Sequence, residues 1–352
     1  GSEMCIRDRS MRRVFVSNWL SSMAILWRSL LLLFLAVLPV QALAQGARLT
    51  VVELNVENLF DTHHDSLKRD EDFLPEGRYR WTPSRYWRKL NRLGQTIIAC
   101  GTDTTRWELP DLVALCEVEN DTVLHDLTRR SLLRRAGYEY VMTDSPDERG
   151  IDVALLYSPF SFRLLYSDTL RVAPARERFR PTRDVLHACG QLATGDTLHV
   201  FVVHAPSRRG GERASRPYRM AVAHRISETI DTLSAAHPAA RILVLGDFND
   251  YNDAPALRFL ASKGLTDVSA EARGTHGARA TYRYQGLWSS LDHILVCSRL
   301  LPAVRQCVII DEPFLIEPDE QYGGVKPRRG YYGPRYNNGY SDHLPLVLRL
   351  EF

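Results

Sequence analysis

The stretch Ile242-Leu-Val-Leu-Gly-Asp-Phe-Asn-Asp250 joins a short apolar run to a cluster of polar residues. Its first half has the length and the apolar, β-branched composition of a buried strand, and Gly246 follows where such a strand ends. A carboxylate and an amide, Asp247 and Asn249, come directly afterwards. Because open α/β sheets bind ligands beyond the carboxyl ends of their strands, this arrangement predicts a functional site at the end of a sheet.

Further polar clusters border other apolar runs of strand length. They are Asn55-Val-Glu57-Asn58, Glu117-Val-Glu-Asn120, His204-Ala-Pro-Ser207, Leu291-Asp292-His293 and Ser341-Asp342-His343-Leu-Pro345. Each cluster alone is a weak signal, since Asn and Asp are common turn residues. Together they place many hard oxygen donors, and no thiolate, at the ends of strands. Such donors suit Mg²⁺ or Mn²⁺ better than zinc or copper.

Helical patterns alternate with the apolar runs. Ser84–Ala99 and Arg216–Leu233 repeat apolar residues at helical spacing. The runs expected to form strands are Leu49–Asn55, Leu112–Glu117, Ile151–Tyr157, Leu198–His204, Ile242–Gly246, Leu291–Val296 and Leu344–Leu350. This interleaving predicts one α/β domain over residues 45–352, without an internal repeat or a linker.

Residues 1–44 differ in composition from the rest and are expected to form a leader. Two arginines precede the apolar run Leu30–Leu38, and Ala42-Leu-Ala44 supplies the small residues of a cleavage site. This order is typical of a secretory signal peptide over 11–44, so we expect a periplasmic or extracellular protein. The alternative is a transmembrane anchor, but the uninterrupted run is far below the ~20 residues that a span needs. Residues 1–10 precede a plausible start and are treated as non-native.

The charge balance excludes one mode of binding. The chain has 45 Lys and Arg and 42 Asp and Glu, of which the leader holds five and two, so 40 of each remain. A neutral protein does not bind nucleic acid by bulk electrostatics, and a polyanion would need a local patch. Residues 171–219 hold ten arginines against four acidic residues, and Lys326, Arg328, Arg329 and Arg335 form a second cluster. A solvated loop surface is the alternative for both.

The cysteines argue against two further classes of protein. Six cysteines without a Cys-x-x-Cys pair are not typical of a disulfide scaffold or a structural zinc site. The five that follow the leader are an odd and scattered set, which favours buried thiols and leaves one disulfide open.

The polar clusters, in this order and spacing, resemble the motifs of the endonuclease/exonuclease/phosphatase superfamily, a group that includes deoxyribonuclease-like metal-dependent phosphohydrolases. The resemblance extends from residue 49 to 346, which is nearly the whole chain after the leader. It implies a four-layer α/β sandwich in which two mixed β-sheets pack face to face with helices outside. The site is then expected at one end of the sandwich.

The resemblance also implies a metal site that holds Mg²⁺ or Mn²⁺. Glu117 resembles the principal metal carboxylate. Asn55 and Glu57 take the first-strand positions that help to bind metal or phosphate, and Asp342 is expected near the metal.

The catalytic roles follow from the same resemblance. Asp247 resembles the residue that orients or deprotonates the attacking water, and Asn249 resembles the one that binds the phosphoryl oxygens. His343 resembles the transition-state histidine, which Asp292 holds in orientation. His204 matches the second histidine of deoxyribonuclease-like members.

Substrate contacts are expected close to these motifs. Arg183 and Arg208 adjoin motif residues and are the favoured phosphate contacts, together with Asn249. The loops Asp61–Pro83 and Pro313–Tyr340 are candidates for substrate choice, the second being rich in Gly, Tyr and Arg. Packed surface loops are the alternative for both.

These residues predict direct attack of water on phosphorus. Hydrolysis of an anionic phosphodiester needs charge neutralisation and a positioned water. The chain contains no Gly-x-Ser-x-Gly elbow, so no seryl nucleophile is indicated. We therefore expect an exported, divalent-metal-dependent phosphodiester hydrolase, with an endonuclease-like nuclease acting on nucleic acid as the favoured type.

Two alternatives stay open. The first is a phospholipid or inositol-phosphate phosphohydrolase of the sphingomyelinase or 5-phosphatase type, for which the sequence offers no clear exposed aromatic hairpin. The second is a non-catalytic binding module on the same fold, which the complete acid/base and metal set disfavours. The sequence does not indicate the oligomeric state.

Overall fold

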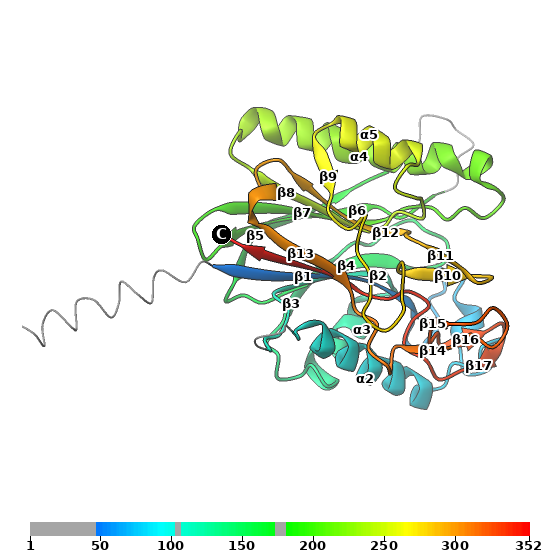
Figure 1. Ribbon diagram of the computed structural model, residues 1–352. Helices are drawn as coiled ribbons and strands as arrows, with labels where there is room; N and C mark the ends of the chain where they lie inside the picture. Colours follow the sequence, from blue (N-terminus) through cyan, green and yellow to red (C-terminus); the bar gives the residue numbers. More distant parts are fainter. Residues whose placement is uncertain (1–46, 103–106, 173–180) are drawn as a thin grey trace, which may run out of the picture. The chain divides into compact units, whose positions relative to one another are not determined.

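Two six-stranded β-sheets lie face to face in Arg48–Phe352, and helices cover the outer face of each (Figure 1). This computed structural model describes residues 47–102, 107–172 and 181–352. The predicted four-layer α/β sandwich is confirmed. The predicted leader, residues 1–44, lies outside the described residues, so its cleavage stays a prediction.

The first sheet has the strand order β13-β18-β1-β2-β4-β3. Its strands are β1 (Arg48–Leu59), β2 (Leu112–Val118), β3 (Glu139–Met142), β4 (Asp152–Tyr157), β13 (Val304–Ile309) and β18 (Leu346–Glu351). The second sheet has the order β5-β6-β7-β8-β12-β9. Its strands are β5 (Phe162–Leu170), β6 (Val185–Leu192), β7 (Thr197–His204), β8 (Arg241–Asp247), β9 (Leu265–Asp267) and β12 (Asp292–Cys297).

Helices and small hairpins complete the fold. The helices are α2 (Pro83–Cys100), α3 (Asp121–His125), the π-helix η2 (Asp126–Arg130), α4 (Glu212–Ala236), α5 (Pro255–Ser262) and the 3-10 turns η1 (Glu71–Phe73) and η3 (Leu301–Ala303). The hairpins are β10 (Tyr282–Tyr284) with β11 (Leu287–Ser289), β14 (Ile316–Pro318) with β15 (Val325–Pro327), and β16 (Tyr331–Tyr332) with β17 (Arg335–Tyr336).

Alternation along the strands creates the layers. On β1, Leu49 and Val51 belong to the core between the two sheets, whereas Val52 and Leu54 belong to the core beneath α2. Successive side chains of a strand point to opposite faces, so β1 has two apolar faces and needs a cover on each. The helix faces that provide these covers consist of Leu90, Leu93 and Ile97 on α2 and Val222, Ile226 and Ile230 on α4.

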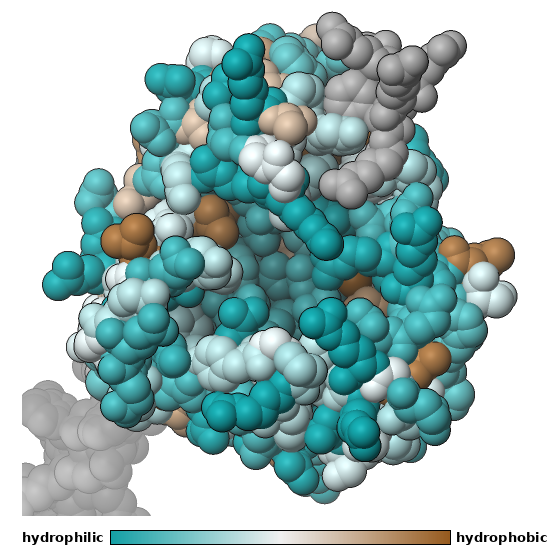
Figure 2. Space-filling model, turned by 90° about the vertical axis from the view of Figure 1, so that its right-hand side faces the viewer, coloured by the Kyte–Doolittle hydropathy of each residue, from teal (hydrophilic) through white to brown (hydrophobic). Residues whose placement is uncertain are grey.

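Strand pairing brings the polar strand ends to one end of the sandwich. β1 runs parallel to β2, and β7 runs parallel to β8. His204 lies opposite Asp247, and Asp247 lies opposite Asp292 on the antiparallel β12. Gly246 has a φ of 142°, and a Cβ there would collide with the backbone of Val203, so glycine permits this close pairing. Figure 2 views this end of the sandwich, which carries a hollow lined by hydrophilic residues.

The seven strands and two helices expected from sequence are all present, with ends that differ by a few residues. Sequence reasoning missed β3 and β13 of the first sheet and β5, β6 and β9 of the second. β5 lies at the edge of its sheet and most of its residues are exposed, so it lacks the regular alternation by which strands are recognised.

The state of the cysteines tests one further expectation. All five cysteines after the leader are free thiols, and Cys100, Cys116 and Cys189 are buried, as predicted for most of them. In the part of the chain that the structure describes, no helix has the length and hydropathy to cross a membrane.

An ion pair between Asp267 and His293 joins β9 to β12. His293 Nδ1 lies 2.8 Å from Asp267 Oδ2, and Nε2 lies 3.0 Å from the carbonyl oxygen of Asp250. Burial disfavours the charged imidazole, but the hydrogen bond and charge of Asp267 more than offset it and raise the pKa of His293. Burial also opposes the charge of Asp267, yet the hydrogen bonds from His293 and Ser269 lower the pKa of this carboxyl.

This pair predicts a pH-dependent stability. The contribution of His293 is complete below its unfolded pKa of about 6.5 and is lost as the pH rises through the higher folded value. The contribution of Asp267 is present above about pH 3.8 and is lost as the pH falls. We expect His293→Gln to lower the free energy of unfolding by about 3 kcal/mol at pH 6 and by less at pH 9, measured by urea unfolding. Equal losses at both pH values would contradict the ion pair.

Candidate active site

Asp247 ends β8 with its carboxylate held by two asparagines. Asn55 Nδ2 donates to Asp247 Oδ2 at 3.0 Å, and the backbone N–H of Asn249 donates to Oδ1 at 2.8 Å. The side-chain amide of Asn249 also donates to Oδ2 at 3.2 Å. Burial, followed by the charge of Asp292, raises the pKa of Asp247 to about 7. The carboxylate is therefore fixed in orientation and basic enough to accept a proton near neutral pH.

His343 and Asp292 form a hydrogen-bonded dyad beside Asp247. His343 Nδ1 lies 2.8 Å from Oδ2 and 3.0 Å from Oδ1 of Asp292, and the hydroxyl of Thr281 donates to Oδ2. One nitrogen or oxygen atom from each of His343, Asp292 and Asp247 lies within 4.8 Å of the others. Burial disfavours the charged imidazole, but nearby carboxylates, above all Asp292, raise the pKa of His343 well above 6.5. With Nδ1 engaged, Nε2–H is the donor that can face a ligand.

Arg329 joins two of the predicted metal carboxylates. Its Nε lies 3.4 Å from Glu57 Oε1, and its Nη2 donates to Asp342 Oδ2 at 2.9 Å. Glu57 Oε2 also accepts a hydrogen bond from the backbone N–H of Gly330 at 2.5 Å. Burial and the charge of Asp342 nevertheless raise the pKa of Glu57 to about 7. Negative charge is therefore crowded at this point.

Glu117, the third predicted metal carboxylate, ends β2 next to the same group. It accepts a hydrogen bond from the backbone N–H of Asn58 at 2.8 Å, and its Oε1 lies 3.8 Å from Arg149 Nη2. Lys89 lies 4.0 Å from Glu57 Oε2. Burial lowers the pKa of the Lys89 ammonium, and the carboxylates of Glu57, Asp342 and Glu117 oppose that effect. Lys89 is thus a cationic neighbour of all three carboxylates, besides Arg329 and Arg149.

Backbone strain is concentrated at the site. Glu57, Asn58, Glu117 and Asn249 have φ values of 52°, 56°, 67° and 50°. Residues with a Cβ rarely adopt this left-handed region, and strained backbone of this kind is typical of functional sites. β1 and β2 both change register here, between Asn55 and Leu59 and between Cys116 and Val118. This irregular backbone sets the positions of Glu57, Glu117 and Asn249 at the site.

His204 lies between the two groups of carboxylates. Its Nε2 is 3.7 Å from Asp247 Oδ2 and 3.8 Å from Glu117 Oε1. Burial, followed by the charges of Arg183 and Arg149, lowers the pKa of His204 well below 6.5. This histidine is therefore neutral, in contrast to His343.

The two predicted phosphate contacts lie in different environments. Arg183 is buried below His204, where its Nε donates to the carbonyl oxygen of His204 at 3.0 Å and its Nη2 to that of Ala205 at 2.8 Å. Its Nη1 lies 3.1 Å from Asp147 Oδ2, so a phosphate contact would require these bonds to open. Arg208 lies over the ring of Tyr251 at 4.3 Å and is nearer to the surface. Both phosphate contacts stay predictions.

Sequence reasoning missed several residues that support the site. Lys89 is 5% exposed on the apolar face of α2, and a lysine within an apolar stripe was the available signal. Glu53 is fully buried in β1, two residues before Asn55. Burial and then the charge of Asp292 raise the pKa of Glu53 well above its usual value, so the surroundings favour its neutral form. Arg149 comes from a loop whose sequence carries no comparable signal.

The sequence of residues 50–352 matches the endonuclease/exonuclease/phosphatase family. The chain belongs to this family. Endonuclease/exonuclease/phosphatase members are phosphoesterase hydrolases that depend on a divalent metal, so the chain is a hydrolase that acts on ester bonds. The alternative of a non-catalytic binding module is thereby set aside. No curated protein matches the chain in sequence.

Solved structures of the endonuclease/exonuclease/phosphatase fold are similar to this one. A mannosyl-6-phosphatase from Bacteroides thetaiotaomicron is 18% identical, with a TM-score of 0.55 over 86% of this chain and 100% of that chain. The human Nocturnin catalytic domain with bound sulfate is 16% identical, with a TM-score of 0.54 over 87% and 94%. The humanised TDP2 of D. rerio is 15% identical, with a TM-score of 0.53 over 87% and 99%. At these identities the likeness supports the fold alone.

The donor set fits the divalent cation of the endonuclease/exonuclease/phosphatase family. Glu57, Glu117 and Asp342 provide hard carboxylate oxygens, and burial together with the charge of Asp342 raises the pKa of Glu57, an effect that a bound cation would oppose. Asp247, Asp292 and His343 are also close enough to share an ion. We assign these three to proton handling instead, because His343 Nδ1 and Asp292 are already bonded to each other.

Proposed function

We propose that this family member is an exported phosphodiesterase of the endonuclease-like nuclease type that works with Mg²⁺ or Mn²⁺. The observation that carries the proposal is the closeness of Asp247, a carboxylate oriented as a base, to the imidazolium of His343. A base for water and a cationic donor for the phosphoryl oxygens within one small volume meet the needs of direct attack on phosphorus.

In the proposed reaction, water forms the new bond to phosphorus and the ester bond to the leaving alkoxide breaks. Asp247 accepts the proton of the attacking water, and its pKa of about 7 suits this role. His343 donates from Nε2 to the phosphoryl oxygens as they gain charge, while Asp292 holds the ring. A divalent ion held by Glu117, Glu57 and Asp342 would supply Lewis-acid neutralisation of the phosphoryl charge. The leaving alkoxide takes a proton from solvent water and Asp247 returns its proton to solvent, so the products are a phosphomonoester and an alcohol.

A cavity with several arginines in its lining supports the proposal of a polyanionic substrate. It has a volume of about 320 Å³ and its lining includes Arg149 and Arg209, together with Arg69 and Arg183, which pair with Glu148 and Asp147 of the same lining. Arg149 links this cavity to the site, since its Nη2 lies 3.8 Å from Glu117 Oε1. Arginines that bind the phosphates on either side of the reacting one would position a nucleic acid strand without reading its sequence. Residues 173–180, which contribute arginines to the predicted basic patch, lie outside the described residues.

A phospholipid or inositol-phosphate substrate is the second candidate. The β10–β11 hairpin carries Tyr284 and Leu287, which are 60% and 72% exposed, and Tyr282 of the same hairpin packs on His343. Sequence reasoning found no clear hairpin of this kind and therefore missed this one. An apolar hairpin tip beside the site would suit contact with a lipid surface.

A panel of substrates distinguishes the proposed nuclease from a phospholipid or inositol-phosphate phosphohydrolase. Purified protein with Mn²⁺ or Mg²⁺ is incubated with plasmid DNA, RNA, sphingomyelin vesicles and inositol phosphates, with EDTA as the metal-free control. We expect nicking of plasmid DNA or cleavage of RNA at a rate at least ~10-fold above that on either lipid or inositol substrates, and none in EDTA. Turnover of vesicles alone would favour the second candidate. Turnover in EDTA would contradict the metal-dependent reaction.

Export is proposed from the leader alone. Cell fractionation should place the protein outside the cytoplasm with a mature N-terminus at Gln45. A cytoplasmic protein that retains residues 11–44 would contradict this.

A further inference from the structure

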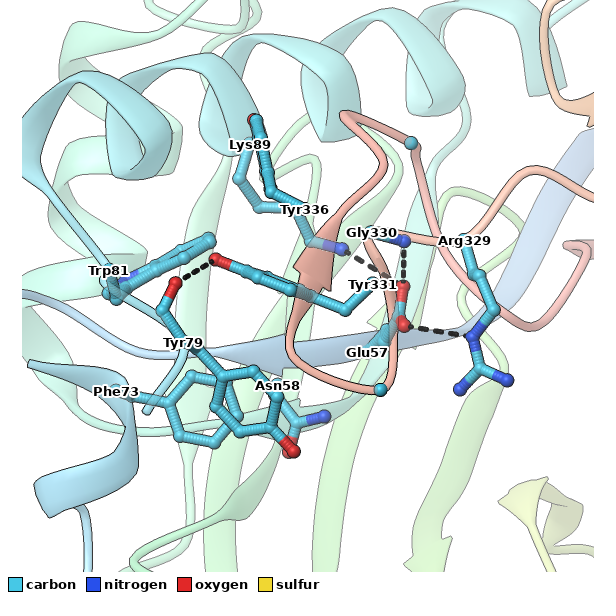
Figure 3. Close-up of a pocket in the computed structure, with 12 residues that line it drawn as sticks. Glu57, Asn58, Phe73, Tyr79, Trp81, Lys89, Arg329, Gly330, Tyr331 and Tyr336 are labelled. Atoms are coloured by element: carbon cyan, nitrogen blue, oxygen red, sulfur yellow. Dashed lines mark hydrogen bonds and ion pairs between the residues drawn. The ribbon is translucent and has the colours of Figure 1, made fainter. Parts of the chain in front are cut away.

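A cavity of about 240 Å³ adjoins the site next to Glu57 and Asn58 (Figure 3). Aromatic residues from two distant segments line it: Phe73, Tyr79, Trp81, Tyr331 and Tyr336. These segments belong to the two loops that the sequence marked as candidates for substrate choice. None of the aromatic residues has a role in the proposed reaction.

The aromatic walls are held in place by their own contacts. Phe73 stacks on Tyr79 with a centroid distance of 4.8 Å, and Tyr79 packs against Tyr331 at 5.0 Å. The hydroxyl of Tyr331 donates to the carbonyl oxygen of Tyr79 at 3.0 Å, and Trp81 Nε1 donates to the carbonyl oxygen of Phe60 at 2.9 Å. The first bond joins the two loops and the second fixes Trp81 to the end of β1, so the cavity is preorganised for a ligand.

The cavity has a polar edge on its side toward the site. Figure 3 places Asn58 next to the Phe73 and Tyr79 rings, and Glu57 faces Gly330 and Arg329. Aromatic walls with hydrogen-bonding groups along one edge suit a planar ring that carries polar atoms on its rim.

One residue, Asn58, connects the cavity to Glu117 of the proposed metal site. The backbone N–H of Asn58 donates to Glu117 Oε2 at 2.8 Å, while the same residue lines the cavity. A group attached to a phosphate bound near Glu117 would therefore have this cavity as its neighbour. The volume is slightly below the ~300 Å³ at which pockets for drug-sized ligands begin, so it fits one ring system with little else.

We infer that this cavity binds the nucleobase of the nucleotide that carries the reacting phosphate. The inference rests on the proposed nuclease function and names where the substrate is held. Stacking on aromatic rings tolerates every base, so the cavity confers a preference for nucleotides over other phosphoesters rather than a preference for one base.

Binding without turnover tests the inference. Calorimetry in EDTA compares 2′-deoxyadenosine 5′-monophosphate with 2-deoxyribose 5-phosphate, which lacks the base, and with mannose 6-phosphate. We expect the nucleotide to bind at least ~10-fold more tightly than either sugar phosphate. Equal affinity for nucleotide and deoxyribose phosphate, or tighter binding of mannose 6-phosphate, would overturn the inference.

Variants of the cavity test whether its aromatic residues cause the preference for the nucleotide. Tyr79→Leu should remove most of the ~10-fold preference while leaving deoxyribose phosphate unchanged. Tyr331→Phe keeps the ring and should stay within about twofold of the wild type, even if Tyr79→Leu fails to fold. Phe160→Leu, in the exposed turn between β4 and β5, is the matched control and should retain the preference. Retention of the preference in Tyr79→Leu, or its loss in Phe160→Leu, would overturn the inference.

A base-free diester separates this inference from the proposed function. If the protein with Mn²⁺ hydrolyses methyl p-nitrophenyl phosphate but shows no base preference in EDTA, the inference fails alone. If it shows the base preference but hydrolyses no diester, the proposed function fails and the cavity assignment stands as a nucleotide-binding site.

Discussion

Replacing His343 with alanine is expected to reduce kcat for phosphodiester hydrolysis by about 10³-fold, within the range known for general acid–base groups. The variant loses the only imidazolium that the described site places beside Asp247, since His204 is held neutral by its buried environment. KM should change far less, because the lost hydrogen bond strengthens as charge develops on the phosphoryl oxygens. The measurement is steady-state kinetics at saturating Mn²⁺, with circular dichroism to verify folding.

Two companion variants make this result specific. Asp292→Asn should lower kcat for the same reason, and the double variant His343→Ala/Asp292→Asn should be little worse than His343→Ala, because the dyad acts as a unit. His237→Ala, at the exposed end of α4, is the matched control and should keep full activity. Full turnover in His343→Ala, or multiplicative losses in the double variant, would contradict the dyad.

Replacing Glu117 with glutamine is expected to weaken binding of the divalent ion by at least about 100-fold. Mutating even a residue that only hydrogen-bonds to a metal ligand typically lowers metal affinity about 10- to 100-fold. Activity should fall at low Mn²⁺ and return in part at high Mn²⁺. Calorimetric titration of the metal into the protein checks the affinity directly. Glu148→Gln changes a half-exposed carboxylate that pairs with Arg69, and serves as the control.

The same titration discriminates between the two groups of carboxylates. If the metal lies with Glu57, Glu117 and Asp342, then Asp292→Asn should bind it nearly as well as the wild type. A loss of affinity in Asp292→Asn with none in Glu117→Gln would instead place the ion on Asp247, Asp292 and His343, whose atoms are also close enough to share one.

The sequence predicted the residues that stand at strand ends. Glu117, Asp247 and Asp292 follow or begin apolar runs, so their position in the fold depends on strand pairing, which alternation of apolar residues indicates. The resemblance to a known family then supplied their roles. Sequence patterns could therefore identify the residues at the strand ends, and the family resemblance could indicate their roles.

The surroundings of these residues could not be predicted in the same way. The bridge from Arg329 to Glu57 and Asp342 depends on the conformation of a loop, and a loop has no periodic pattern to read. Lys89 donates at 2.5 Å to the carbonyl oxygen of Tyr340, so its role depends on contact with a residue far away in the sequence. The aromatic cavity likewise requires two distant loops to meet, as Tyr79 and Tyr331 do.

The stereochemical course at phosphorus tests the central claim most directly. The claim is that water activated by Asp247 attacks the phosphorus without a covalent enzyme intermediate. Hydrolysis of a chiral phosphorothioate diester in ¹⁸O-labelled water should proceed with inversion and place the label on phosphorus. Retention of configuration, or label in the alcohol product, would contradict it.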